Sequence, residues 1–253
     1  MAERKIDSRR VIRDVQRDLV SPERRLFAKR VLTLGGLTML TGCELTDRAP
    51  VNAILRTISR SNDVVQAWLF DPKKLAPTYP ESMITRPFPF NAYYDIDQVP
   101  DVDADTYRLH VGGAVQGKRV WTLAELRALP QHDQVTRLIC IEGWSAIGRW
   151  GGTPVATFLQ RVGADTTAKY VSFQCADDYS TSIDMRTALH PQTLLALSYD
   201  GQVLAPKYGF PLRLLVPTKL GYKSAKHIVS MSVTNVYPGG YWENQGYNWF
   251  SGS

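Results

Sequence analysis

The chain has 253 residues, a length that suits one ordinary domain or two small ones built around a sizeable core. Hydrophobic residues make up 44% of it and charged residues 21%, the proportions of a folded globular protein, which argues against wholesale disorder. Three cysteines in this length exclude a disulfide scaffold. The net charge of +6 raises the question of nucleic-acid binding.

The excess positive charge is concentrated at the start of the chain. Residues 1–42 hold ten basic and five acidic residues, whereas residues 43–253 hold twenty basic and nineteen acidic ones. The body is therefore close to neutral and has no basic stripe of the kind that phosphate-backbone binding requires. The composition predicts that nucleic acid is not a partner.

Residues 1–43 have the features of an export signal. Arg24 and Arg25 precede a short apolar run over 31–41, which ends in Leu-Thr-Gly-Cys at Cys43. Eleven residues are too few to cross about 30 Å of hydrocarbon as a helix, so the pattern predicts a signal peptide rather than a spanning helix. The alternative is a basic amphipathic N-terminal helix with an ordinary buried cysteine.

The arginine pair resembles a twin-arginine signal, and the sequence that ends at Cys43 resembles a lipoprotein cleavage box. The first resemblance implies a periplasmic enzyme that is exported already folded, often around a cofactor. The second implies a membrane anchor through a lipidated Cys43.

The rest of the chain predicts an N-terminal helical and loop extension over 44–84 and one α+β domain over 85–253. Apolar spacing predicts one or two helices over 47–70, and six prolines predict a long ordered loop over 71–100. We expect a mixed β-sheet with short helices and long ordered loops. The expected strands are Tyr107–Val111, Val135–Cys140, Tyr170–Gln174, Leu194–Ser198, Leu212–Val216 and Ile228–Thr234, and the expected helices are Leu123–Leu129 and Val155–Val162, the second with Thr153 as its N-cap and Pro154 at N1.

Cys140 is the first candidate for chemistry. It ends an apolar strand, and Glu142 and Gly143 then turn the chain, which favours a thiol that faces a cleft. A thiolate is a soft metal ligand and also a nucleophile. An inert buried cysteine, or a disulfide with Cys175, would also fit the spacing, whereas the absence of a Cys/His quartet argues against structural zinc.

Arg213 lies inside a very apolar predicted strand, where an unpaired charge is costly, so we expect it to meet an anion or a carboxylate. The following loop carries Lys219, Lys223 and Lys226 together with glycine and serine, which suits a phosphate, although a solvated basic loop would have the same composition.

Two aromatic segments complete the candidates. In the long loop, Asn91, Tyr94 and Asp95 offer groups suited to a polar heterocycle, or to ordinary loop hydrogen bonding. In the tail, six aromatic residues and three glycines lie within 237–250. That bias favours a strap packed over the core, with the wall of a substrate cleft as the alternative.

Two motifs carry a resemblance to a known family. Cys140-Ile-Glu-Gly-Trp-Ser, followed by Trp150-Gly-Gly-Thr-Pro, resembles the molybdopterin-binding domain of the sulfite oxidase family. The segment from Pro211 to Lys226 resembles that family's cofactor-phosphate segment. The motifs occur in the family's order and cover most of residues 85–253. The most similar branch is the exported bacterial one that contains the periplasmic methionine sulfoxide reductase.

The resemblance implies a sulfite oxidase-type fold, a molybdenum–molybdopterin cofactor and Cys140 as the thiolate ligand of molybdenum. It further implies that a set of residues binds the pterin and its phosphate: Asn91, Tyr94, Asp95, Cys175, Tyr208, Arg213, Ser224, Ala225 and Lys226. Tyr208 stands where the reductase branch usually has asparagine.

The resemblance also implies an oxidoreductase that transfers an oxygen atom to or from a small molecule. Sulfite-oxidising members carry an arginine-rich stretch after the ligand cysteine, whereas here the acidic Glu142 follows it, which favours reduction of a sulfoxide or a similar oxygen donor. The chain has no haem-attachment motif. We therefore expect a separate electron partner, either a membrane b-type cytochrome or a soluble cytochrome c.

Two other classes of function stay open at this point. One is an exported enzyme that uses Cys140 as a nucleophile, such as a transpeptidase, which would need a histidine placed as base. The other is a lipoprotein that binds a ligand without catalysis.

Overall fold

The computed structural model describes residues 49–252. The chain divides into two compact units, Met1–Thr57 and Ile58–Ser253, and both sheets, the core and the pockets belong to the second. The predicted signal and Cys43 lie outside the described residues. Within residues 49–252, no helix is both long enough and apolar enough to cross a bilayer.

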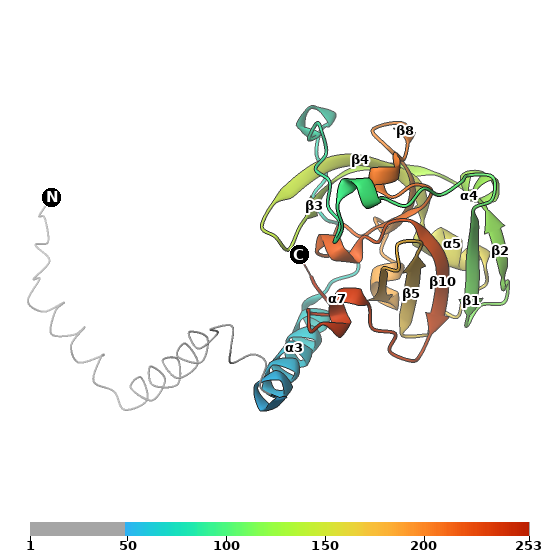
Figure 1. Ribbon diagram of the computed structural model, residues 1–253. Coiled ribbons are helices and arrows are strands. Elements are labelled where there is room, and N and C mark those ends of the chain that lie inside the picture. The colour runs from blue at the N-terminus through green and yellow to red at the C-terminus, as the bar shows by residue number, and fades with distance from the viewer. Residues whose placement is uncertain (1–48, 253) are drawn as a thin grey trace, which may run out of the picture. The chain divides into compact units, whose positions relative to one another are not determined.

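The first sheet is mixed and has the strand order β2-β1-β10-β5-β6 (Figure 1). Only the pairing of β1 with β10 is parallel, and this pairing joins strands from opposite ends of the domain. The strands are β1 (Arg108–Gly113), β2 (Arg119–Thr122), β5 (Tyr170–Cys175), β6 (Ser180–Asp184) and β10 (Ile228–Thr234).

The second sheet is antiparallel throughout and has the order β3-β4-β7-β8, with β9 paired to β7 off this path. Its long β3–β4 hairpin curves around one side of the domain (Figure 1). The strands are β3 (His132–Ile139), β4 (Ser145–Pro154), β7 (Leu194–Tyr199), β8 (Gln202–Val203) and β9 (Arg213–Leu215).

The helices are short apart from the first. They are α3 (Ala49–Leu69), α4 (Leu123–Arg127), α5 (Val155–Arg161), α6 (Met185–Ala188) and α7 (Tyr241–Asn244), with 3₁₀ turns η1 (Glu81–Met83), η2 (Ile96–Gln98), η3 (Pro206–Tyr208) and η4 (Gly221–Lys223). A capping box fixes the start of α4, because the Thr122 hydroxyl accepts from the Glu125 amide and the Glu125 carboxylate accepts from the Thr122 amide.

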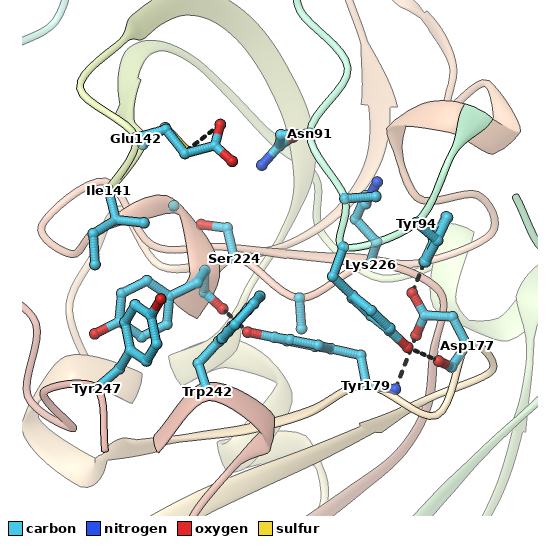
Figure 2. Close-up of a pocket in the computed structure, with 16 residues that line it drawn as sticks. Asn91, Tyr94, Ile141, Glu142, Asp177, Tyr179, Ser224, Lys226, Trp242 and Tyr247 are labelled. Atoms are coloured by element: carbon cyan, nitrogen blue, oxygen red, sulfur yellow. Dashed lines mark hydrogen bonds between the residues drawn. The ribbon is translucent and has the colours of Figure 1, made fainter. Parts of the chain in front are cut away.

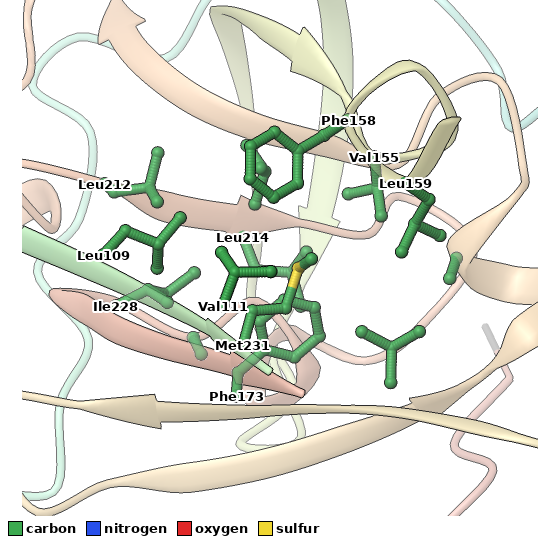
Figure 3. Close-up of a cluster of buried hydrophobic side chains, with 14 of the residues drawn as sticks. Leu109, Val111, Val155, Phe158, Leu159, Phe173, Leu212, Leu214, Ile228 and Met231 are labelled. Carbon is green, nitrogen blue, oxygen red and sulfur yellow. The ribbon is translucent and has the colours of Figure 1, made fainter. Parts of the chain in front are cut away.

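The main core lies where the first sheet meets α5, β7 and β9 (Figure 3). Alternating side chains of β1, among them Leu109, point inward, as expected for a strand with one buried face. Phe158 of α5 packs edge-on against Trp121 with ring centroids 5.1 Å apart. A smaller cluster around Trp150, Phe88 and Tyr208 lies on the second sheet.

The predicted α+β class, the six predicted strands and both predicted short helices are confirmed to within three residues at each end. The helix at 47–70 is a single one. The sheet prediction was incomplete, because there are two sheets and β2, β4, β6 and β8 were missed. Glycines at 148, 151 and 152 and an arginine between them conceal β4 as a strand in the sequence.

The predicted cap of α5 was wrong. Pro154 rather than Thr153 is the N-cap residue, and no side chain caps the helix there. Thr153 belongs to β4, and its hydroxyl accepts a hydrogen bond from the Gln131 side chain at 3.0 Å. The hairpin and the helix therefore meet without an intervening loop.

Substitution of Gly152 tests how closely β4 and β7 approach each other. A Cβ at Gly152 would lie 2.1 Å from the Leu195 carbonyl oxygen, whereas a Cβ at Gly112 would meet nothing within 4 Å. We expect Gly152→Ala to lower the free energy of unfolding by roughly 1–3 kcal/mol more than Gly112→Ala does. Urea unfolding of the two variants measures this, and equal effects would contradict the packing at Gly152.

Candidate functional site

Cys140 lies in the tight turn that joins β3 to β4. Its amide donates to the Trp144 carbonyl at 2.9 Å, and the Gly143 amide donates to the Cys140 carbonyl at 3.2 Å. Gly143 has a φ of +91°, a conformation that favours glycine, so the turn predicted from the sequence is confirmed. The turn holds the thiol half-buried at the end of the hairpin rather than within the core.

The Cys140 turn forms one wall of a pocket built from five segments that are distant in the sequence (Figure 2). The pocket has a volume of about 810 Å³, its open mouth included. Glu142 and Asn91 lie toward one end of it, and Trp242 and Tyr247 toward the other (Figure 2). The lining residues are Asn91–Tyr94, Cys140–Glu142, Asp177, Tyr179, Gly221, Tyr222, Ser224–Lys226, Trp242 and Tyr247.

Glu142 is the acidic group next to the thiol. Its carboxylate accepts a hydrogen bond from the Trp144 indole at 3.0 Å and lies 3.7 Å from the Cys140 sulfur, which donates to it. Burial is the main reason why the pKa of the Cys140 thiol lies above its usual value, and the Glu142 carboxylate raises it further. Without a cation beside it, the thiol is therefore protonated and weakly nucleophilic at neutral pH.

The loop from β9 to β10 forms the second wall and is fixed to β9 by hydrogen bonds. The Ser224 hydroxyl accepts from the Val216 amide at 3.1 Å, and the Ala225 carbonyl accepts from the Leu214 amide at 2.8 Å. The Tyr179 hydroxyl donates to the Tyr222 carbonyl at 2.6 Å from across the pocket. These bonds hold residues 224–226 against the pocket.

Asp177 ties the long loop to the end of β5. Its carboxylate accepts from the Tyr94 hydroxyl at 3.0 Å, and its carbonyl accepts from the Tyr93 hydroxyl. The ring of Tyr93 also stacks on Tyr241, with centroids 4.6 Å apart. The long loop expected over 71–100 is thereby anchored at the pocket by Tyr93 and Tyr94.

Arg213 is 1% exposed and pairs with no carboxylate of the described residues, so of its two expected partners only a bound anion stays open. One Nη donates to the Tyr208 carbonyl at 3.0 Å, and the guanidinium lies 4.7 Å from the centroid of the Trp150 ring. Its Nε and its other Nη are buried without a hydrogen-bond partner. Burial lowers the pKa of Arg213 to about 10, so it still carries its charge at neutral pH.

Lys226 lies next to this buried guanidinium, and His227 follows it in the chain. The Lys226 ammonium lies 4.7 Å from the Phe90 ring centroid, and its one hydrogen bond, to the Lys207 carbonyl, is long at 3.4 Å. Burial, followed by the charge of Arg213, lowers the pKa of Lys226 to about 7. The Nδ1 atom of His227 donates to the Phe210 carbonyl at 2.7 Å, and its Nε2 atom is buried without a partner. The unsatisfied donors of Arg213 and the poorly bonded Lys226 ammonium fit an anion.

A close approach at Gly209 makes this arrangement of cations possible. Gly209 has a φ of +108°, and a Cβ there would lie 3.0 Å from the Lys226 side chain and 3.2 Å from that of Arg213. The turn η3 therefore brings its backbone against both cations, which only glycine allows at this position without strain.

Lys219 and Lys223 do not line the pocket beside Lys226. They therefore neither form a phosphate site with it nor belong to a solvated basic loop, the two arrangements expected from the sequence. Lys223 is buried in an ion pair with Glu243 of α7 and donates to the Ser182 carbonyl at 2.9 Å. Lys219 is buried beside the rings of Phe70 and Phe250. Both ammonium groups are in the interior, and only Lys226 lines the pocket.

Six of the predicted site residues line the pocket: Asn91, Tyr94, Cys140, Ser224, Ala225 and Lys226. The side chains of Asp95, Cys175, Tyr208 and Arg213 lie outside its lining. The Tyr208 hydroxyl donates to the Phe88 carbonyl at 3.1 Å. Both Cys175, which is buried, and Cys140, which is half-buried, are free thiols. The disulfide that the spacing allowed is therefore absent.

Sequence reasoning missed Asp177 and Tyr179 and placed Trp242 and Tyr247 chiefly in a strap over the core. The strap also forms the pocket wall. A signal for Asp177 was present, because two aspartates follow Cys175 directly at the end of a strand. The spatial neighbour of Asp177, Tyr94, is 83 residues away, and no local pattern links the two.

A family model described as the oxidoreductase molybdopterin binding domain matches residues 96–242. The chain belongs to this family. The match includes the Cys140 turn, Arg213 and the loop to Lys226, and it ends at Trp242 of the pocket wall. The protein is a molybdopterin-dependent oxidoreductase, and the resemblance to the sulfite oxidase family is confirmed.

Curated relatives carry reductase names. The chain is 64% identical over 241 residues to a putative protein-methionine-sulfoxide reductase subunit, YedZ1, of Azospira oryzae, covering 95% of this chain and 92% of that protein. It is 32% identical over 206 residues to the protein-methionine-sulfoxide reductase catalytic subunit MsrP of Ralstonia nicotianae, covering 70% of this chain and 61% of that one. MsrP of Burkholderia mallei is 36% identical over 152 residues, which cover 54% of this chain and 46% of that protein.

Among solved structures, the sulfane dehydrogenase SoxCD of Paracoccus pantotrophus aligns with a TM-score of 0.51 at 20% identity. The alignment covers 55% of this chain and 40% of that one. At this identity the likeness concerns the fold, and it confirms the sulfite oxidase-type fold expected from the sequence.

The site fits the family's cofactor. Within residues 49–252 no group of three or more His, Cys, Asp or Glu side chains could hold a metal ion. A metal bound at the Cys140 sulfur would therefore take its other ligands from the cofactor, as a dithiolene allows. The unpartnered donors of Arg213, together with the weakly bonded Lys226 ammonium, suit an anionic group.

The pH dependence of unfolding tests whether burial lowers the pKa of Lys226. In the unfolded chain the lysine keeps its usual pKa of 10.5, whereas in the cofactor-free folded chain its pKa is about 7. Between these values the unfolded state binds more protons, so the free energy of unfolding rises with pH from about 7 to about 10.

We expect Lys226→Met to reduce this rise and to stabilise the cofactor-free protein at pH 6–7, because it removes the burial of a charge. Urea unfolding at pH 6, 7, 8 and 9 measures it. Lys169→Met, which alters an exposed lysine, is the matched control and should leave the slope unchanged. An equal slope in wild type and Lys226→Met would contradict the lowered pKa.

Proposed function

We propose that the protein is an exported reductase of sulfoxides, most specifically of methionine sulfoxide within peptides or proteins, that uses molybdenum–molybdopterin and receives electrons from a separate redox partner. The observation that carries the proposal is the placement of the Cys140 thiol in one pocket with Lys226 and with an aromatic wall of Trp242 and Tyr247. The names of the relatives support the substrate.

Cys140 is proposed as the protein's ligand to molybdenum. The hairpin turn holds its sulfur at the pocket, and a metal cation beside it would lower the thiol pKa and favour the thiolate. The residues that hold the cofactor's anionic end are Lys226 and Arg213. Ser224 and Ala225 line the cofactor beside them, and Asn91 and Tyr94 contact it from the opposite wall.

Arg213 acts from behind the pocket lining. Its free donors and its charge, which persists at neutral pH, attract an anion toward Lys226. An anion bound at Lys226 would favour the protonated amine and so bring its pKa back up from about 7. Binding of the cofactor above pH 7 is therefore accompanied by uptake of a proton at the Lys226 Nζ atom.

The substrate wall is suited to a neutral, partly apolar molecule. Trp242, Tyr247 and the half-exposed Ile141 offer apolar contact area in the lining of the pocket. Glu142 places a negative charge beside Cys140, which disfavours an anion such as sulfite. A thioether side chain with a neutral S=O group meets both requirements.

The overall reaction is the conversion of a sulfoxide, two electrons and two protons into a thioether and water. The bound molybdenum cofactor supplies the oxygen-atom transfer and stores the two electrons. The chain's residues position the sulfoxide, exclude bulk water through the aromatic wall and hold the cofactor's charge. Electrons would come from a membrane b-type cytochrome or a soluble cytochrome c.

Export through the twin-arginine signal and a periplasmic location complete the proposal. Arg24 and Arg25 support it, together with the apolar run that ends at Cys43. Cell fractionation of the wild type and of an Arg24→Lys/Arg25→Lys variant tests it, since the variant should remain in the cytoplasm.

Turnover of the purified holoenzyme tests the activity. With a reduced artificial electron donor, we expect the highest kcat/KM for peptides that contain methionine sulfoxide, lower values for small sulfoxides and N-oxides, and little oxidation of sulfite with an artificial acceptor. Efficient sulfite oxidation without sulfoxide reduction would overturn the proposed substrate while leaving the oxidoreductase class intact.

The variant Cys140→Ser distinguishes a metal-ligating Cys140 from an inert one. A serine hydroxyl is a poorer ligand than thiolate for this metal, so we expect loss of bound molybdenum and at least about a hundredfold loss of sulfoxide turnover, with an unchanged circular dichroism spectrum. Metal analysis and turnover measure it. Cys43→Ser is the control and should keep full molybdenum. Retained turnover in Cys140→Ser would refute the assignment.

Glu142→Gln tests the effect of the negative charge beside Cys140. Removal of one negative charge beside the reacting centre should raise kcat/KM for sulfite or an anionic sulfoxide several-fold, while it changes that for a neutral sulfoxide by less than about twofold. Parallel kinetics at low and high salt measure it, because a charge effect is larger at low ionic strength. An equal change for neutral and anionic substrates would contradict the electrostatic role.

A further inference from the structure

The helix α3 exposes an apolar face to solvent over its second half. Spacings of three and four residues bring the side chains of this face onto one side of the helix. Its members and their exposed fractions are Ile58 (56%), Val64 (69%), Val65 (52%), Trp68 (79%) and Leu69 (67%). Large apolar side chains gathered in this way are unusual on a soluble surface and mark an interaction site.

The opposite face of the same helix is attached to the C-terminal segment. The Phe250 amide donates to the Asp63 carboxylate at 2.6 Å, and the Gly252 amide donates to the Gln66 side chain at 2.9 Å. The Ser59 carbonyl accepts a further hydrogen bond from Asn248 at 3.4 Å. Polar contacts thus fix the helix to the body with its apolar face turned outward.

A groove and a set of basic residues adjoin this apolar face. Leu69 belongs both to the face and to the lining of the groove, which continues over Phe70, Leu75, Ile139 and Phe250. Lys74 and Arg137 also line the groove and are exposed, and Arg60 and Lys73 are exposed nearby on α3 and just after it. The acidic residue of the groove, Asp71, accepts a hydrogen bond from the Lys73 amide.

The position of α3 in the chain indicates what covers its face. Only five residues lie between Cys43 and Ala49, where the helix begins, so the distance between the two is at most about 20 Å. If Cys43 carries a lipid, the helix starts within that distance of the bilayer surface. A tryptophan-containing amphipathic helix with exposed basic residues beside it is suited to lie in the headgroup region of an anionic membrane.

We propose that the apolar face of α3 binds the surface of an anionic phospholipid bilayer, with Trp68 and Leu69 inserted among the acyl chains and with Arg60, Lys73, Lys74 and Arg137 near the phosphates. The helix lies along the surface. The body is held there through Asp63 and Gln66, which places the enzyme beside partners in the same membrane. This inference does not depend on the reaction that the pocket catalyses.

Vesicle binding of the full chain tests the proposal, with Cys43→Ser in every variant so that no covalent lipid contributes. The vesicles contain phosphatidylglycerol and phosphatidylethanolamine, or phosphatidylcholine alone. We expect tighter binding to the anionic vesicles, a difference that shrinks with salt, and a roughly ten- to hundredfold loss of binding in Val65→Asp. Val203→Asp is the matched control, since Val203 is 58% exposed on β8, and it should bind as before.

Fluorescence quenching by brominated acyl chains locates the contact. All six tryptophans lie within residues 68–249, so the quenched signal can be assigned by substitution. We expect quenching in wild type that is largely lost in Trp68→Phe and in Val65→Asp but kept in Val203→Asp. Absence of a Trp68-dependent component overturns the proposal even if the vesicles bind the chain, because residues 1–48 could hold it there without α3.

Analytical sedimentation without lipid tests whether a second copy of the chain covers the apolar face of α3. A dimer in wild type that Val65→Asp dissociates would assign the face to a second copy of the chain and overturn the membrane proposal. A monomer at all concentrations, together with Trp68-dependent quenching, supports it.

Discussion

The burial of positive charge without an internal counter-charge is the constraint on which the site depends. Arg213 is enclosed at the start of β9, charged at neutral pH, and satisfied only by one carbonyl and by the face of Trp150. A guanidinium in such a place costs several kcal/mol unless an anion meets it. Lys226 lies on the pocket side of the same group and shares this requirement.

Two sheets that do not share a strand bring the ends of the site together. The antiparallel sheet ends in the hairpin turn that carries Cys140, and its β9 carries Arg213. The loop after β9 then returns past the pocket and continues as β10 in the centre of the mixed sheet. The thiol and Lys226 therefore come from different segments of the two-sheet framework and meet at one pocket.

The Lys223–Glu243 ion pair contributes to the same rigidity from behind the pocket. It joins η4, whose neighbours Ser224 to Lys226 line one wall of the pocket, to α7, whose Trp242 lines another. Glu243 also accepts from the Thr181 hydroxyl at 2.7 Å, so the pair is fixed to β6 as well. A buried pair of this kind gives little net stability but does specify one arrangement of the two walls.

The sequence by itself determined the family and the cofactor class, and it named six residues that line the pocket. Short motifs with characteristic local order, such as the turn after Cys140 and the segment from Arg213 to Lys226, carry that information because the chain folds back on itself within a few residues there. Apolar periodicity likewise predicted six strands, but it could not reveal β4, whose glycines have no side chains to form a pattern.

Only the tertiary structure decided which charges face the pocket and what closes it. Lys219, Lys223 and Lys226 are alike in sequence, yet only Lys226 lines the pocket, because Glu243 and the rings of Phe70 and Phe250 draw the other two inward. Asp177 meets Tyr94 across 83 residues of chain. Contacts between such distant segments depend on how the two sheets pack, and that packing is a property of the whole domain rather than of any local pattern.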